Sequence, residues 1–167
     1  LDMKDLNDLI KFLKKIKATG GARIRLRKMD LAEAVVVTPF DASFGNENDL
    51  KSQSGCLSFA ADKAIPEKET TCAMVEFNST TITRVVKSTM AAESASLSSA
   101  LDRNLYLRLL LEAMIYGEPE TGSEWRHGLK IKGVLVTDAR SLFDHLSTTG
   151  SVPKERQTLI DLLVARD

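Results

Sequence analysis

Three carboxylates stand out because each adjoins a segment that reads as part of a hydrophobic core. Asp41 follows the β-rich run at residues 35–40, and Asp138 follows a second apolar run that ends at Thr137. Glu93 lies at the head of a helical pattern, among alanines. Carboxylates held close together repel one another and raise their own pKa values unless a cation lies among them.

The rest of the composition favours a hard cation as the partner of these carboxylates. The two cysteines, Cys56 and Cys72, form no C-x-x-C pattern, and both histidines lie far from them in sequence, so a zinc site is not indicated. Oxygen ligands without Cys or His are typical of Mg²⁺ or Mn²⁺ sites. A pair of such ions can activate a water and stabilise the leaving oxygen in phosphodiester hydrolysis. If the fold brings Asp41, Glu93 and Asp138 together, their residue types suit a hard divalent cation and phosphodiester hydrolysis.

Each carboxylate alone also has an ordinary structural interpretation. An aspartate after a strand, such as Asp41 or Asp138, is commonly a turn residue or a helix N-cap. A glutamate near a helix start, such as Glu93, is commonly a surface residue stabilised by the helix dipole. The neighbouring Ala91 and Ala92 argue against that last interpretation, because they make this helical stretch look buried.

Hydrophobic periodicity predicts the elements that must position these residues. Residues 3–17 form an amphipathic helical pattern, and residues 23–27 alternate arginine with apolar residues, as in a short strand. Further strands are expected at 35–40, 56–60, 71–77 and 130–137, and helices at 90–116, 139–146 and 154–166. The pairing of the apolar run at 81–86 stays open, and residues 117–128 are expected to form a loop.

The order of these elements predicts an α/β fold with a mixed sheet. Short β-rich segments separated by turns favour an antiparallel meander. The strand after the long helix is expected to lie parallel to the first strand through a right-handed crossover. That topology places Asp41 and Asp138 on neighbouring strand ends, with Glu93 on the crossing helix facing them.

Composition and charge limit the setting and the partners. The chain has 167 residues, 43% of them hydrophobic and 28% charged, as expected for one globular domain with a small appendage. No apolar run approaches the ~20 residues that span a bilayer, and no signal peptide is visible, so an intracellular protein, cytoplasmic or nuclear, without a membrane partner is expected. Residues 1–30 carry nine Lys or Arg and four acids, a net +5, which leaves −5 for the rest. This asymmetry fits a nucleic-acid backbone contact beside a carboxylate site, and equally a solvated helix face.

Several short motifs, in order along the chain, together resemble one known family. They are Phe-Asp-Ala-Ser-Phe-Gly-Asn at 40–46, Lys-Ser-Gln-Ser-Gly at 51–55, Ser-Thr-Met-Ala-Ala-Glu-Ser-Ala-Ser-Leu at 88–97, Leu-Arg-Leu-Leu-Leu-Glu at 107–112 and Val-Thr-Asp-Ala-Arg-Ser at 136–141. The combination resembles the ribonuclease H domain of copia-class LTR retrotransposon polyproteins. Residues 154–167 are similar to that family's next helix, and residues 3–17 to the helix that joins the reverse transcriptase to the domain.

The resemblance implies a ribonuclease H-like domain at 35–167, preceded at 1–34 by a basic helix and strand like the reverse transcriptase connection. Its sheet would combine an antiparallel three-stranded meander with a parallel strand, flanked by helices. The implied activity is that of a metal-dependent endonuclease which hydrolyses the RNA strand of RNA–DNA hybrids during reverse transcription. The implied partners are the hybrid and the reverse transcriptase domain of the same polyprotein.

The resemblance also implies roles for individual residues. Asp41, Glu93 and Asp138 match the family's metal-binding catalytic carboxylates, which use Mg²⁺ or Mn²⁺. Apart from the resemblance, Lys51 and Arg140 flank the predicted site in sequence and are candidates for phosphate contacts, with solvated surface charges as the alternative.

The end of the chain departs from the family pattern. The family continues into a last strand and helix with a fourth aspartate in an Ala-Asp-x-x-Thr-Lys pattern, whereas this sequence stops at Asp167, and Asp161 and Asp167 do not match that ligand. Two alternatives therefore stay open. The same fold without its last strand and helix could be an inactive module for nucleic-acid binding or protein interaction, or the fold could serve a different metal-dependent nuclease or transferase.

Overall fold

The β-rich segments form one four-stranded sheet in the order β3-β2-β1-β4. The protein is described here by a computed structural model, which covers residues 3–20, 28–46, 50–65, 67–117, 128–148, 153 and 156–166. Its elements are helix α1 (Met3–Ala18), a 3₁₀ turn (Leu31–Glu33), strands β1 (Ala34–Ser43), β2 (Gln53–Asp62) and β3 (Cys72–Thr81), helix α2 (Thr89–Tyr116), strand β4 (Lys132–Val136) and helices α3 (Arg140–Ser147) and α4 (Arg156–Arg166).

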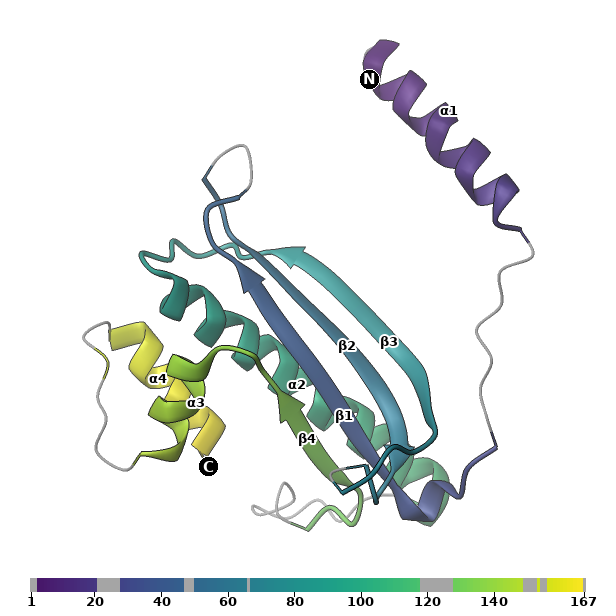
Figure 1. The fold of residues 1–167 in the computed structure, drawn as a ribbon, viewed down its shortest axis with the longest axis vertical. Coiled ribbons are helices and arrows are strands. Elements are labelled where there is room, and N and C mark those ends of the chain that lie inside the picture. Colours follow the sequence, from purple (N-terminus) through teal and green to yellow (C-terminus); the bar gives the residue numbers. More distant parts are fainter. Residues whose placement is uncertain are drawn as a thin grey trace.

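The sheet has the mixed topology that the sequence predicts. Strands β1, β2 and β3 are antiparallel neighbours, and β4 pairs in parallel with β1. Figure 1 shows α2 lying across one face of the sheet, α3 and α4 beside it, and α1 standing away from the sheet. The α/β class is confirmed, and the arrangement is compatible with a ribonuclease H-like fold without being specific to it. Among the described residues, no helix combines the length and the apolar character needed to cross a membrane.

Strands β1, β2 and β3 are longer than hydrophobic periodicity predicts, whereas β4 is shorter than the predicted strand at 130–137. Strand β1 continues past its apolar run to Ser43, because its last residues pair with the start of β2 as far as Ser43↔Gln53. Strand β3 ends at Thr81. The N–H of the next residue, Ile82, donates to the Ser52 carbonyl at 2.7 Å. The predicted strand at 23–27 and most of the predicted loop at 117–128 lie outside the described residues.

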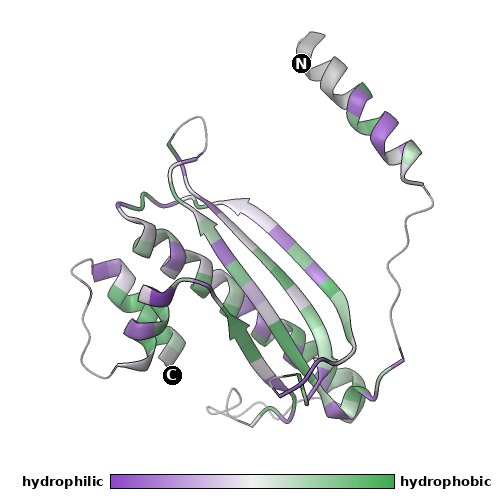
Figure 2. Cartoon of the chain, viewed as in Figure 1, coloured by the Kyte–Doolittle hydropathy of each residue, from purple (hydrophilic) through white to green (hydrophobic). Residues whose placement is uncertain are grey.

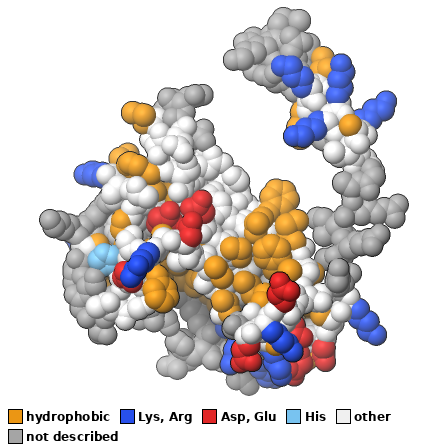
Figure 3. Space-filling model, in the orientation of Figure 1, with side chains coloured by type: hydrophobic (Ala, Val, Ile, Leu, Met, Phe, Trp, Pro, Cys, Tyr) orange, Lys and Arg blue, Asp and Glu red, His pale blue; other side chains and the backbone are white. Residues whose placement is uncertain are grey.

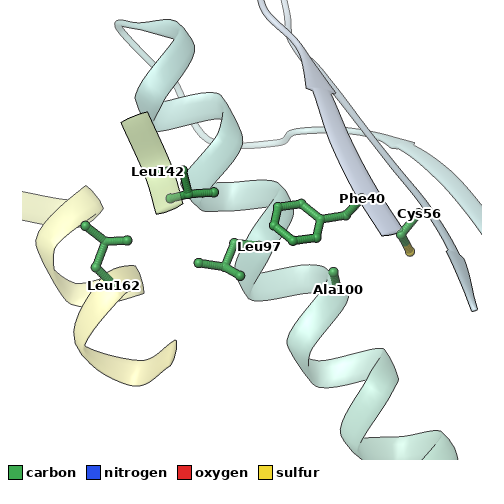
Figure 4. Packing of buried hydrophobic residues seen from close by; sticks show 6 residues of the cluster. All are labelled: Phe40, Cys56, Leu97, Ala100, Leu142 and Leu162. Atoms are coloured by element: carbon green, nitrogen blue, oxygen red, sulfur yellow. The ribbon is translucent and has the colours of Figure 1, made fainter. Parts of the chain in front are cut away.

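Helix α2 covers the sheet closely because small side chains line its buried side. Ala91, Ala92 and Ala100 are buried there, and the Ser88 hydroxyl caps the helix start by accepting from the Ala91 N–H at 3.1 Å. Phe40 of β1 points into a core with Leu97 of α2 and with leucines from α3 and α4 (Figure 4). The valines of β1 and β4 make both strands hydrophobic over much of their length (Figure 2).

A buried polar contact also fixes α2 along β1. The Asn104 amide donates to the Val36 carbonyl at 2.9 Å and to Thr38 Oγ1 at 3.1 Å, and Thr38 in turn bonds Ser58 of β2 at 3.1 Å. Because an unpaired buried amide is costly, these bonds favour one register of the helix on the sheet. The position of every α2 side chain relative to β1, including that of Glu93, depends on that register.

Candidate active site

The first two carboxylates lie together at one end of the sheet. Asp41 lies within β1, opposite Gly55 of β2, and not after the strand as predicted, because pairing with β2 continues to Ser43. Strand β4 stops opposite Pro39, and beyond that point no strand in the described part of the chain pairs with this edge of β1. The chain then turns, and Asp138 follows β4 at this uncovered edge.

Asp41 and Asp138 line the same groove, which has a volume of about 640 Å³. Figure 3 shows acidic side chains gathered on this face of the molecule. Gly55 places no side chain opposite Asp41, which helps to keep the groove open. The groove is also lined by Pro39, Phe40, Ser43, Gln53, Cys56, Leu57, Asn78, Ser79, Val136 and Thr137. Its walls therefore combine apolar surface with uncharged hydrogen-bonding groups next to two carboxylates.

Glu93 is the buried member of the set. It lies in the first turns of α2 and is only 5% exposed, so the interpretation as a surface residue is wrong. The pKa of Glu93 is raised to about 7, chiefly by burial and then by the negative charges of Asp41 and Asp138, while the Ala42 backbone N–H partly opposes the shift. The three predicted carboxylates therefore lie near enough to repel one another.

One oxygen of Glu93 has no hydrogen-bond partner among the residues that the structure describes. This Oε2 atom is buried, and a buried carboxylate oxygen without a hydrogen bond is costly in a protein interior. A cation in contact with Glu93 would coordinate this oxygen. Its positive charge would favour the ionised form of Glu93, which the charges of Asp41 and Asp138 disfavour. As the side chains stand, no three Asp, Glu, His or Cys groups in the described part of the chain are arranged to hold an ion. The Asp41 Oδ1 atom instead accepts from the Ala42 N–H at 2.8 Å.

Asp138 does not serve as the helix cap that its position after a strand suggested. The N-cap of α3 is Ala139, with no side-chain capping bond, and the Ala139 N–H donates to Thr137 Oγ1 at 3.1 Å. The Asp138 carboxylate is exposed, lines the groove and contributes to the raised pKa of Glu93. Thr137 thus makes a local turn bond to Ala139, and α3 begins without a side-chain cap.

The two predicted phosphate contacts lie beside the groove and not in its wall. Arg140 is highly exposed on α3, with its Nε atom 3.8 Å from Asp144 Oδ2. Lys51 is exposed at the start of the segment that leads into β2. Their positions leave the role of either residue in phosphate binding as a prediction.

Sequence reasoning missed the polar side chains of β2 and β3 that line the groove. Gln53 donates to Ser79 Oγ at 2.6 Å, and Asn78 lies next to that serine. The period-two pattern places Gln53 on the same face as Gly55, the partner of Asp41. That alternation is the signal from which Gln53 could have been found.

Comparison with known proteins gave no family model, no curated protein and no solved structure that matches the chain.

Proposed function

We propose that this domain is a metal-dependent endonuclease that hydrolyses the RNA strand of RNA–DNA hybrids, as the resemblance to copia-class ribonuclease H domains implies. The proposal depends on the buried Glu93 oxygen near Asp41 and Asp138, for which the described residues offer no hydrogen-bond partner. Burying a carboxylate beside two acidic side chains costs folding free energy and raises its pKa to about 7. Carboxylates with pKa values shifted in this way are typical of functional sites. The proposed setting is a retrotransposon polyprotein that also contains a reverse transcriptase.

The residues fit Mg²⁺ or Mn²⁺ in the chemistry of their donors. Asp41, Glu93 and Asp138 would hold the metal through carboxylate oxygens, which are the ligands that both ions prefer. When bound, the metal would supply a water of lowered pKa and stabilise charge on the leaving oxygen. Glu93 would contribute the buried negative charge, and the exposed Asp41 and Asp138 would face the substrate in the groove.

The remaining groove residues orient the nucleic acid. The uncharged side chains of Gln53, Asn78 and Ser79 present hydrogen-bonding groups, and Leu57 and Val136 present apolar surface. No lysine or arginine lines the groove among the described residues, so backbone phosphates would be held at its rim. Lys51 and Arg140 are the proposed rim contacts.

The proposal is tested by cleavage of an end-labelled RNA–DNA hybrid with Mg²⁺ or Mn²⁺. The wild type should cut the RNA strand only when metal is present, and Asp41→Asn should lose the activity while folding normally. Asp102→Asn is the matched control, because Asp102 is an exposed aspartate on α2 that does not line the groove. Equal activity in Asp41→Asn and wild type would refute the proposal.

A second candidate function is an inactive module that binds nucleic acid or protein through the same fold. It is favoured by the finding that no three potential ligands in the described residues are arranged to hold an ion. Hybrid binding without cleavage, at any Mg²⁺ or Mn²⁺ concentration, would support this candidate. Cleavage of duplex DNA as well as hybrid would instead indicate a different metal-dependent nuclease.

A further inference from the structure

Ser96 connects α2 to strands β1 and β2 by hydrogen bonds. It lies one turn after Glu93 and is fully buried. Its hydroxyl donates to the backbone carbonyl of Asp41 at 2.8 Å and lies 2.8 Å from the hydroxyl of Ser54 on β2. A single side chain therefore joins the backbone of one proposed ligand to the helix that carries another.

The donor and acceptor in each hydrogen bond of Ser96 follow from the number of hydrogens that a hydroxyl group carries. A serine hydroxyl has one hydrogen, and Ser96 uses it on the Asp41 carbonyl, which can only accept. In the contact between the two serines, Ser54 must therefore be the donor and Ser96 the acceptor. The result is a directed chain from Ser54 through Ser96 to the Asp41 carbonyl, in which each bond polarises and strengthens the next.

We propose that Ser96 is a positioning residue, which sets the distance between Glu93 and Asp41 and so prepares these carboxylates to share a metal ion. This inference rests on the proposed function. Groups that orient metal ligands without touching the metal affect its affinity strongly in other proteins. Asp41 needs such support because it lies where β4 no longer covers the edge of β1.

Ser94 provides a matched comparison on the same helix. It is as fully buried as Ser96, but its hydroxyl donates to the Met90 carbonyl at 2.8 Å, within α2 itself. Such a bond satisfies the hydroxyl locally and makes no connection to β1 or β2. Replacing either serine by alanine removes a buried hydroxyl oxygen. Only Ser96→Ala also removes the hydrogen bond to the Asp41 carbonyl.

The test measures Mn²⁺ binding by electron paramagnetic resonance of free Mn²⁺, together with thermal unfolding without metal. Ser96→Ala should raise the Kd about tenfold at unchanged stoichiometry, whereas Ser94→Ala should leave the Kd within about twofold of wild type. Ser96→Thr, which keeps the hydroxyl, should restore much of the affinity. Ser54→Ala should have a smaller effect, because the bond from Ser96 to Asp41 remains.

A purely structural role for Ser96 would give a different result. It would lower the unfolding temperature and the fraction of protein that binds, while the Kd of the remaining folded protein stayed at the wild-type value. Equal Kd values in wild type, Ser94→Ala and Ser96→Ala would overturn the positioning role and leave the metal site intact. A wild type that binds no Mn²⁺ would overturn the proposed function and this inference together.

Discussion

At the scale of single residues, the ionised form of the buried Glu93 carboxylate opposes folding. Its pKa of about 7 in the folded protein lies above its ordinary value of 4.5, so the folded state holds the proton more tightly than the unfolded chain does. Stability from this group is therefore fully present below about pH 4.5 and is lost as the pH rises to about 7. The corresponding free energy is at most about 3 kcal/mol.

Replacing Glu93 by glutamine should therefore stabilise the protein at alkaline pH. Near pH 4.5 the variant and the wild type should have similar free energies of unfolding. At pH 8, without metal, Glu93→Gln should be more stable by up to about 3 kcal/mol, because it carries no buried charge next to Asp41 and Asp138. Urea unfolding at both pH values measures this difference.

The same variant should lose its response to metal. Millimolar Mg²⁺ should raise the unfolding temperature of the wild type at pH 8 and leave that of Glu93→Gln unchanged. Asp102→Asn, on the exposed side of α2, should behave as the wild type in both experiments. A lower stability of Glu93→Gln at pH 8 would show that the Glu93 charge is compensated within the protein itself.

At the scale of elements, periodicity predicts what α2 is but not how it is held. The run of alanines and leucines from residue 91 onward predicts the helix and its end near Tyr116, as observed. The hydrogen bonds from Asn104 to Val36 and from Ser96 to Asp41 join residues more than 50 positions apart. Hydrophobic periodicity within one segment does not predict such pairs. The extra length of β1 escaped prediction for the same reason, since pairing with β2 and not hydrophobicity extends it.

Substitutions at two glycines test the packing of α2 on β4 and the open space of the groove separately. A Cβ atom at Gly133 of β4 would collide with the buried Asn104 side chain and come within 2.9 Å of Arg108 Cδ, whereas at Gly55 the nearest atom would be 3.9 Å away. Gly133→Ala should therefore cost about 2 kcal/mol of unfolding free energy. Gly55→Ala should keep its stability but cut the hybrid more slowly, because the added methyl group enters the groove opposite Asp41.

Thermal unfolding and single-turnover cleavage of the two variants measure these effects. If Gly133→Ala were as stable as the wild type, the proposed tight contact between Asn104 and β4 would be wrong. If Gly55→Ala cut hybrid at the wild-type rate, substrate would not use the groove next to Asp41.

At the scale of the whole molecule, α1 carries five of the nine basic residues found in the first 30 positions of the sequence. Lys14, Lys15 and Lys17 are exposed on this helix, while Asp41 and Asp138 lie in the groove of the sheet. A basic segment joined to an acidic site suits a nucleic-acid duplex whose phosphates are held on one part of the chain and cut on another.

Replacing Lys14, Lys15 and Lys17 by glutamine should weaken binding to an RNA–DNA hybrid and to duplex DNA alike. The slope of log affinity against log salt should become shallower by about 2 to 3, because each lost phosphate contact removes close to one unit. Fluorescence anisotropy at several salt concentrations measures the slope. An unchanged slope would show that α1 does not touch the nucleic acid.

The candidate site was predictable to the extent that it depends on topology. The connection through α2 makes β4 a parallel neighbour of β1 and so brings Asp138 to the part of β1 that carries Asp41, a placement that follows from the order of the elements. The burial of Glu93 and the polar wall from Gln53 to Ser79 depend on side-chain packing between elements. Sequence patterns do not fix such packing.

The most direct test of the central claim is Mn²⁺ or Mg²⁺ binding by isothermal titration calorimetry to wild type, Asp41→Asn, Glu93→Gln and Asp138→Asn, with Asp102→Asn as control. Wild type and control should bind at pH 8, and each of the three site variants should bind at least about tenfold more weakly, because the carboxylates share one site. Full-strength binding by all three site variants, or none by the wild type, would contradict a metal site built from Asp41, Glu93 and Asp138.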